Sequence, residues 1–223
     1  MNALHWEAVP EVARDILALL GQTALAEQFY LAGGTGLALL LGHRISADLD
    51  LFSRENTLSS SERRELLRAL AEFWPGDALK VALEKDGTLI IALQGVTTSL
   101  FHYQYPLVSP TMSLAGNLSL ASLEDIGLMK VAAIIGRGTK RDFVDLFFVT
   151  KEVPLERLLE LGATKFPQAR DLPLQALKAM AYFADADRDP ALRTLVEVDW
   201  EEVKHHFEAQ AVSLGRRWSG LTP

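Results

Sequence analysis

Two aspartates, Asp48 and Asp50, alternate with leucines and could together bind a metal ion. The segment Asp48 to Phe52 alternates acidic and apolar residues with period two, so a strand would place both carboxylates on one face. Two like charges at that separation repel unless a cation lies between them. Mg²⁺ suits such a pair, because it binds through one or two carboxylates together with the phosphate oxygens of a substrate. We therefore predict a magnesium site at Asp48 and Asp50.

A diglycine precedes the acids. Tyr30 to Ala32 reads as a short strand, Gly33-Gly34 as a turn, and Thr35 to Leu41 as a short buried helix. Without Cβ atoms, the turn lets backbone N–H groups approach a polyphosphate, which the N-terminus of the helix also attracts. We expect Gly33, Gly34 and Thr35 to bind phosphates. Arg44 could reach phosphate oxygens or bind nearby backbone carbonyls. An ordinary turn and a solvated edge strand would explain either motif alone.

The segment LAGGTGLALLLGHRISADLDLF, Leu31 to Phe52, resembles the glycine-rich loop and acidic strand of nucleotidyltransferases with the polymerase-β fold. The resemblance is stronger to the AbiEii/AbiGii toxin family, and it continues at Ala121 to Val149 and more weakly at Leu177 to Asp187. It implies an α+β fold: a polymerase-β-like nucleotidyltransferase core, made of a mixed sheet with flanking helices, followed by a helical C-terminal lobe. It also implies an enzyme of the EC 2.7.7 type that uses Mg²⁺.

In the resembled family, a lysine on one helix, an arginine at its end and an aspartate on the next helix lie near the nucleotide. These positions match Lys130, Arg137 and Asp142, with Asp145 as a second candidate. The cations would offset charge on the triphosphate and the departing pyrophosphate. Asp142 would position Lys130 or act as a base. The residues alone also allow a surface lysine, a helix C-terminal cation and a capping acid.

One position departs from the resembled pattern. The polymerase-β fold usually supplies a third acid from a later strand, and Ser99 stands at the matching position. The resemblance therefore leaves open a site with one magnesium ion, or an acid contributed by the helical half.

The spacing of apolar residues predicts the helices and strands that carry these residues. We predict a helix from Pro10 to Glu27, with Val12 in its apolar stripe, and a helix capped by Ser59 through a capping box with Glu62. Strands are expected at 79–84, 88–94 and 97–103, the first two joined by a hairpin turn at Asp86-Gly87. Pro106 and Pro110 break the pattern, and from Leu120 onward only helices are expected. These include one capped by Thr139. The expected domains are a nucleotidyltransferase core at 1–118 and a helical lobe at 119–223 that completes the active site.

Composition and net charge limit the kinds of site, surface and location that the chain can have. The chain has 223 residues, and its formal charge of −7 argues against a broad basic surface. It has no cysteine, which excludes disulfides and thiolate metal sites. Any contact with nucleic acid must be local, and candidate basic patches are Arg63, Arg64 and Arg68, and Arg137, Lys140 and Arg141. The apolar runs are too short to span a membrane, and the N-terminus does not look like a secretory signal, so a cytoplasmic protein is expected. His205-His206 reads as surface.

We hypothesise a Mg²⁺-dependent nucleotidyltransferase that moves a nucleoside monophosphate from an NTP to a hydroxyl acceptor. The resemblance implies an RNA acceptor such as the 3′ end of tRNA, a toxin of a toxin–antitoxin or abortive-infection system, and a cognate antitoxin as partner. A non-catalytic nucleotide-binding or interaction protein on the same fold is the alternative, because Ser99 replaces an acid. A glycosyltransferase with an Asp-x-Asp metal site ranks lower, since it needs no diglycine.

Overall fold

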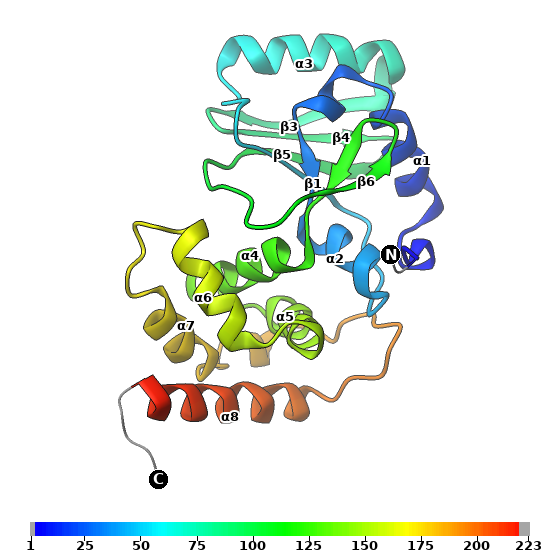
Figure 1. Cartoon of the computed structure of the whole chain (residues 1–223). Helices are drawn as coiled ribbons and strands as arrows, with labels where there is room; N and C mark the ends of the chain where they lie inside the picture. The colour runs from blue at the N-terminus through cyan, green and yellow to red at the C-terminus, as the bar shows by residue number, and fades with distance from the viewer. Residues whose placement is uncertain (1–2, 219–223) are drawn as a thin grey trace. The chain divides into compact units, whose positions relative to one another are not determined.

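A computed structural model describes residues 3–218 of the chain. The chain forms two compact units, Met1–Ser122 and Leu123–Pro223. The α-helices and several strands of the two units are labelled in Figure 1. None of the helices within residues 3–218 is long and apolar enough to cross a bilayer.

The first unit is built on a seven-stranded mixed sheet of strand order β3-β4-β5-β2-β1-β7-β6. The β2–β5 and β1–β7 pairs are parallel, and the other pairs are antiparallel. The strands are β1 (Tyr30–Leu31), β2 (Leu49–Ser53), β3 (Leu79–Lys85), β4 (Thr88–Leu93), β5 (Val96–His102), β6 (Met112–Ala115) and β7 (Leu118–Leu120). The helices and 3-10 turns are η1 (Trp6–Ala8), α1 (Glu11–Leu20), η2 (Ala24–Glu27), α2 (Gly33–Leu41), α3 (Ser60–Phe73) and η3 (Gly76–Ala78).

The predicted β3–β4–β5 meander is confirmed, with its first turn at Asp86-Gly87, where Gly87 has a φ of +76°. The β6–β7 hairpin was not predicted, because Pro106 and Pro110 made this region read as a break. Its strands are only four and three residues long, too short to show a clear period.

The predicted helix from Pro10 to Glu27 is wrong in extent. It divides at Gly21 into α1 and η2. The β6–β7 turn lies against Gly21, whose carbonyl accepts a hydrogen bond of 2.9 Å from the backbone N–H of Asn117. Val12 is 45% exposed, and Ala13 and Leu17 take part in the buried stripe instead.

Strand β3 forms one end of the sheet and pairs only with β4. Val81 and Leu83 on this strand are 44% and 40% exposed. The pairing of β3 with β4 shifts register between the same two residues. The outer edge of the sheet is therefore partly apolar and irregular.

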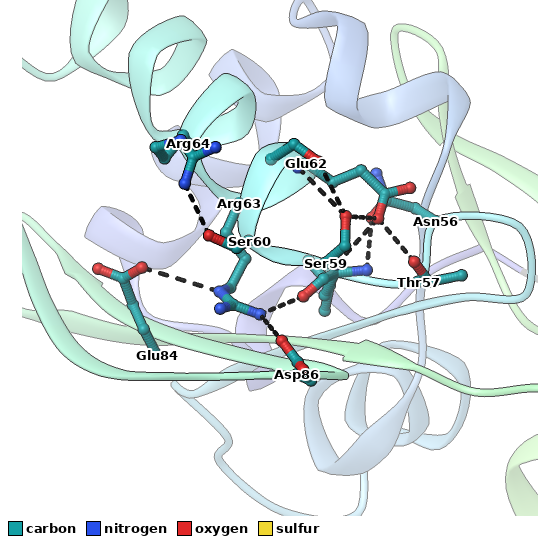
Figure 2. Close-up of polar contacts among 11 residues, drawn as sticks. Asn56, Thr57, Ser59, Ser60, Glu62, Arg63, Arg64, Glu84 and Asp86 are labelled. Atoms are coloured by element: carbon teal, nitrogen blue, oxygen red, sulfur yellow. Dashed lines mark hydrogen bonds and ion pairs between the residues drawn. The ribbon is translucent and has the colours of Figure 1, made fainter.

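The capping box at the start of α3 is confirmed. The Ser59 side chain accepts from the backbone N–H of Glu62, and the Glu62 side chain accepts from the backbone N–H of Ser59. Figure 2 shows this network, in which Glu62 also accepts a hydrogen bond from Thr57. Hydrogen bonds from Ser59 and Thr57 lower the pKa of Glu62 to about 2.

The first predicted basic patch is not a common basic surface, because Arg63 is only 8% exposed. Its guanidinium donates to the Leu58 carbonyl and to Asp86, 2.9 Å away, and its Nε lies 3.7 Å from Glu84 (Figure 2). Arg63 thus ties the start of α3 to the β3–β4 hairpin. Arg64 and Arg68 remain exposed.

The second unit is helical, with α4 (Leu123–Gly136), α5 (Lys140–Glu152), α6 (Leu155–Lys165), α7 (Leu172–Met180), η4 (Ala186–Arg188) and α8 (Trp200–Trp218). Thr139 caps α5 by accepting from the backbone N–H of Asp142, as predicted. Phe143 is fully buried, with its ring centroid 5.0 Å from that of Phe183 and 5.7 Å from that of Phe207. These rings form the aromatic centre of the helical core.

We predict that Ser59→Ala lowers the free energy of unfolding at pH 7 by about 1 kcal/mol, because α3 loses its cap. Glu62 has a lowered pKa in the folded state, so its stabilisation is present above its ordinary pKa of 4.5 and is lost as pH falls toward 2. The deficit of the variant should therefore shrink between pH 7 and pH 3 in urea unfolding. Ser60→Ala is the control, and an equal loss in both variants would contradict the cap.

Candidate active site

The glycine bend between β1 and α2 lies directly against Asp50. Gly33 has a φ of +63°, and a Cβ atom on it would stand 2.3 Å from Asp50 Oδ2. The backbone N–H of Ala32 donates to the carbonyl of Asp50 at 3.0 Å, which holds the two strands in register. Glycine is thus required at position 33 for two reasons, which are the left-handed backbone conformation and the closeness of the Asp50 carboxylate.

Helix α2 starts at Gly33, so Gly33 and Gly34, predicted as a turn before the helix, belong to its first turn together with Thr35. Ala32 occupies the N-cap and supplies no side-chain hydrogen bond. The first N–H groups of a helix have no partner within the helix and carry its positive end. The start of α2 is therefore suited to an anion, and the Asp50 carboxylate is beside it.

Arg44 covers the second glycine of the bend. A Cβ atom on Gly34 would lie 2.4 Å from Arg44 Nη2 and 3.2 Å from Ser46 Oγ. Arg44 is only 4% exposed, and its guanidinium donates to the Ile45 carbonyl at 3.2 Å. It therefore makes one of the backbone contacts considered from sequence, and it brings a buried positive charge to the bend.

Thr35 holds the segment that leads into β2. The residue is fully buried, and its hydroxyl donates to the Asp48 carbonyl at 2.5 Å and lies 2.9 Å from Ser46 Oγ. Its hydroxyl therefore serves the loop that carries Asp48. The backbone of Thr35 remains part of the start of α2.

The alternation predicted for the acidic segment is confirmed. Leu49 and Leu51 are fully buried, whereas Asp50 is half-buried. Asp48 is exposed and lies one residue before β2. On the parallel neighbour β5, Ser99 is in register with Asp50, so both side chains point to the same face of the sheet. Ser99 is 7% exposed.

By the chemistry of their side chains, Asp48 and Asp50 would suit a magnesium ion that is shared with a substrate. No group of three or more His, Cys, Asp or Glu side chains within residues 3–218 could hold a metal. Two carboxylates without further protein ligands suit Mg²⁺, which retains water and phosphate oxygens as ligands. They suit a structural zinc site poorly, because that needs four protein ligands.

In the helical unit, α4, the turn after it and α5 bring together four charged residues predicted from sequence. Lys130 Nζ lies 3.1 Å from Asp142 Oδ1 and 2.7 Å from Asp145 Oδ2. Arg137 holds Asp142 with two bonds, Nε to Oδ2 at 2.8 Å and Nη2 to Oδ1 at 2.9 Å. We call Lys130, Arg137, Asp142 and Asp145 the charge cluster. Its formal charges cancel.

The members of the charge cluster differ in access to solvent. The side chains of Asp142 and Asp145 are fully buried and that of Lys130 is 7% exposed, whereas that of Arg137 is 64% exposed. Burial alone would raise the pKa of Asp142. Hydrogen bonds from Arg137 and Thr139 and the charge of Lys130 outweigh burial and lower this pKa to about 2. Asp142 is therefore ionised at neutral pH and poorly suited to act as a base.

Other polar residues of the helical unit have structural partners. Lys140 of the second predicted basic patch donates to the Asp189 carbonyl at 2.7 Å, while Arg141 is exposed. His206 is half-buried with Nε2 3.0 Å from Thr150 Oγ1, so only His205 fits the predicted surface position.

The sequence reading also missed a buried ion pair. Lys165 and Asp125 are both fully buried, with Nζ 2.7 Å from Oδ1. Burial lowers the pKa of Lys165, which the bond to Asp125 partly offsets. A lysine at the end of the amphipathic segment 155–165 gave no signal that distinguished it from a solvated cation.

Comparisons with known proteins identify the family. Residues 15–218 match the family described as nucleotidyl transferase AbiEii toxin, type IV TA system. The uncharacterised protein aq_aa25 of Aquifex aeolicus (strain VF5) is 32% identical over 201 residues, which cover 87% of this chain and 92% of that protein.

Solved structures show the same fold at low sequence identity. A candidate nucleotidyltransferase from H. pylori has a TM-score of 0.55 and 21% identity, covering 96% of both chains. ANT(2″)-Ia in complex with adenylyl-2″-tobramycin has a TM-score of 0.52 and 16% identity, covering 71% of this chain and 99% of the other. The α+β architecture, a mixed sheet with flanking helices followed by helices, is thus that of nucleotidyltransferases. On the match over residues 15–218, the chain belongs to the nucleotidyl transferase AbiEii toxin family and is a nucleotidyltransferase.

Proposed function

We propose that the protein transfers a nucleoside monophosphate from an NTP to a hydroxyl of RNA, with Mg²⁺ as cofactor. An acceptor hydroxyl oxygen attacks the α-phosphorus, the bond from that phosphorus to the bridging oxygen breaks, pyrophosphate leaves, and the hydroxyl proton passes to water. The observation that carries the proposal is the packing of the Asp50 carboxylate against Gly33, at the uncapped start of α2. This arrangement sets a metal ligand beside a place suited to phosphate.

Within the first unit, Asp48 and Asp50 would hold Mg²⁺, which supplies a positive charge that offsets charge on the reacting phosphates. The backbone of Gly33, Gly34 and Thr35 would bind phosphate oxygens at the start of α2. The Thr35 hydroxyl positions Asp48 through its carbonyl. Arg44 adds positive charge behind Gly34.

Within the helical unit, we propose that Arg137 binds a substrate phosphate, because its side chain is the exposed member of the charge cluster. Asp142 fixes the plane of the guanidinium. Lys130 and Asp145 hold Asp142 and α5 in place, so they act as positioning residues. We further propose that this lobe, with the core at 1–118, is needed for a complete active site.

The family description supports a toxin role in a type IV toxin–antitoxin system. We propose that the toxin works in the cytoplasm, where NTPs and RNA such as tRNA are found, and that a cognate antitoxin opposes it. A non-catalytic nucleotide-binding protein remains a second candidate, because Ser99 faces Asp50 in register where a third acid would stand. Family membership disfavours a glycosyltransferase.

Asp50→Asn should lower the transfer of labelled nucleotide to RNA by at least about 100-fold, because an amide is a poor ligand for Mg²⁺. The assay uses each labelled NTP in turn, total RNA and Mg²⁺, with and without EDTA. Asp77→Asn, at a fully exposed position, is the control and should keep wild-type transfer. Transfer that survives in Asp50→Asn would contradict the assignment, and NTP binding without any transfer would favour the non-catalytic protein.

Gly33→Ala should abolish transfer, because the new methyl group must displace the Asp50 carboxylate. Gly76→Ala is a matched control, since Gly76 has a φ of +61° but no atom within 4 Å of the added Cβ. Both variants should lose about 1–2 kcal/mol of stability from the left-handed backbone. Only Gly33→Ala should lose activity, and equal activity in both variants would refute the role of this contact.

Lys130→Met should lower the free energy of unfolding at pH 7 by about 3 kcal/mol, because two buried carboxylates lose their shared cation. The lowered pKa of Asp142 means that its stabilisation is present above its ordinary value of 3.8 and is lost as pH falls through 2. The deficit of the variant should therefore shrink toward pH 3. Lys80→Met, at a lysine 67% exposed, should change stability by less than about 0.5 kcal/mol. A Lys130 variant as stable as wild type would contradict the cluster.

A further inference from the structure

The helical unit contains a pocket whose wall includes Arg137, the residue proposed to bind a substrate phosphate. It has a volume of about 460 Å³, within the usual range of sites for small ligands. It lies between the end of α4 with the following turn and α7 with the residues after it. The lining residues are Ile134, Ile135, Gly136, Arg137, Gly138, Gln175, Lys178, Ala179, Tyr182 and Asp185.

Arg137 gives the pocket a fixed cation. Its Nε and Nη2 are held by the buried carboxylate of Asp142, yet the side chain stays 64% exposed. A guanidinium held in one plane loses less conformational freedom on binding phosphate than a mobile side chain does. The pocket is thus prepared for an anionic oxygen at this wall.

The side of the pocket formed by α7 and the residues after it carries an aromatic ring, an amide and a second cation. Tyr182 lines the pocket and is 59% exposed, so its ring is accessible to a planar base. Gln175 offers an amide that can donate and accept hydrogen bonds. Lys178, exposed on the same helix, adds a second cation. Aromatic and basic side chains side by side are the usual means of binding single-stranded nucleic acid.

The charge of the pocket favours a phosphodiester over a triphosphate. The charge cluster behind Arg137 sums to zero, and Asp185 is paired with Arg188 at 3.5 Å. Lys178 is left as the local excess, a single positive charge. A nucleotide within a strand carries one negative charge, which matches this single excess, whereas a triphosphate carries several charges that the pocket would leave unneutralised.

We infer that this pocket binds a nucleotide of the single-stranded RNA acceptor, with its base on Tyr182 and its phosphate between Arg137 and Lys178. The inference rests on the proposed function, which supplies RNA as acceptor, and it assigns α7 and the α4–α5 turn to acceptor recognition.

Gly136 allows a test by filling the pocket. It is the last residue of α4, and a Cβ added to it meets no atom within 4 Å, so Gly136→Leu should fold. Binding of a 5′-labelled single-stranded RNA of mixed sequence is measured by fluorescence anisotropy, without NTP or Mg²⁺. Gly136→Leu, Tyr182→Ala and Lys178→Glu should each raise Kd at least about fivefold. Gly136→Ala should have a smaller effect than Gly136→Leu.

Two controls lie outside the pocket. Leu174→Ala removes an apolar side chain that is 55% exposed on the same helix, and Arg193→Glu makes the same charge change as Lys178→Glu. Both should bind RNA like the wild type. Wild-type protein that does not bind the RNA, or pocket variants that bind as well as these controls, would overturn the inference.

A kinetic measurement separates acceptor from donor. At saturating NTP, the pocket variants should raise KM for the RNA and leave KM for NTP unchanged. A rise in KM for NTP alone would assign the pocket to the donor and overturn the inference. If neither the wild-type protein nor any variant transfers nucleotide, the proposed function fails. The binding measurement still tests whether the pocket binds RNA.

Discussion

The contact between Asp50 and Gly33 fixes the position of the acid in the candidate site. The carboxylate occupies the space that any side chain at position 33 would need. Antiparallel pairing of β1 with β2 fixes this approach, and the left-handed backbone at Gly33 starts α2 beside it. Strand pairing therefore determines where the acid lies relative to the helix, without help from a flexible loop.

The helical unit buries ionised groups in an apolar interior. Asp142 and Asp125 are both fully buried, and each faces a lysine. Buried ion pairs add little net stability, because desolvation cancels most of the attraction, but removing one partner is costly. Such pairs set which helices lie together. The pair of Lys165 and Asp125 joins α6 to α4, and Lys130 joins α4 to α5.

Sequence patterns predicted the parts of the fold that local rules control. The alternation at Asp48 to Phe52 and the caps at Ser59 and Thr139 depend on neighbours in the chain, and the structure has them. The family resemblance correctly identified a nucleotidyltransferase fold. Residue types could not reveal partners distant in sequence. Arg63 reads as a surface cation until the β3–β4 hairpin packs on it.

The same limit applies at the site. The pattern predicts that Thr35 binds phosphate, but it does not contain the hydrogen bond that folding forms between the Thr35 hydroxyl and the carbonyl of Asp48. That bond links residues 13 apart in sequence, so no local pattern contains it. Ser99 was placed by resemblance alone, and only the parallel register of β2 and β5 sets it opposite Asp50. The predicted roles of these residues stay proposals.

The irregular outer strand has a consequence for association. An unpaired strand edge with apolar side chains can recruit the same edge of another molecule and extend a sheet between chains. In β3 the shift in pairing between Val81 and Leu83 breaks the even spacing of N–H and C=O groups that such recruitment needs. Lys80, Glu84 and Lys85 add charge along the same strand. The exposed Val81 and Leu83 thus lie on a strand whose irregular backbone disfavours pairing with the same strand of a second molecule.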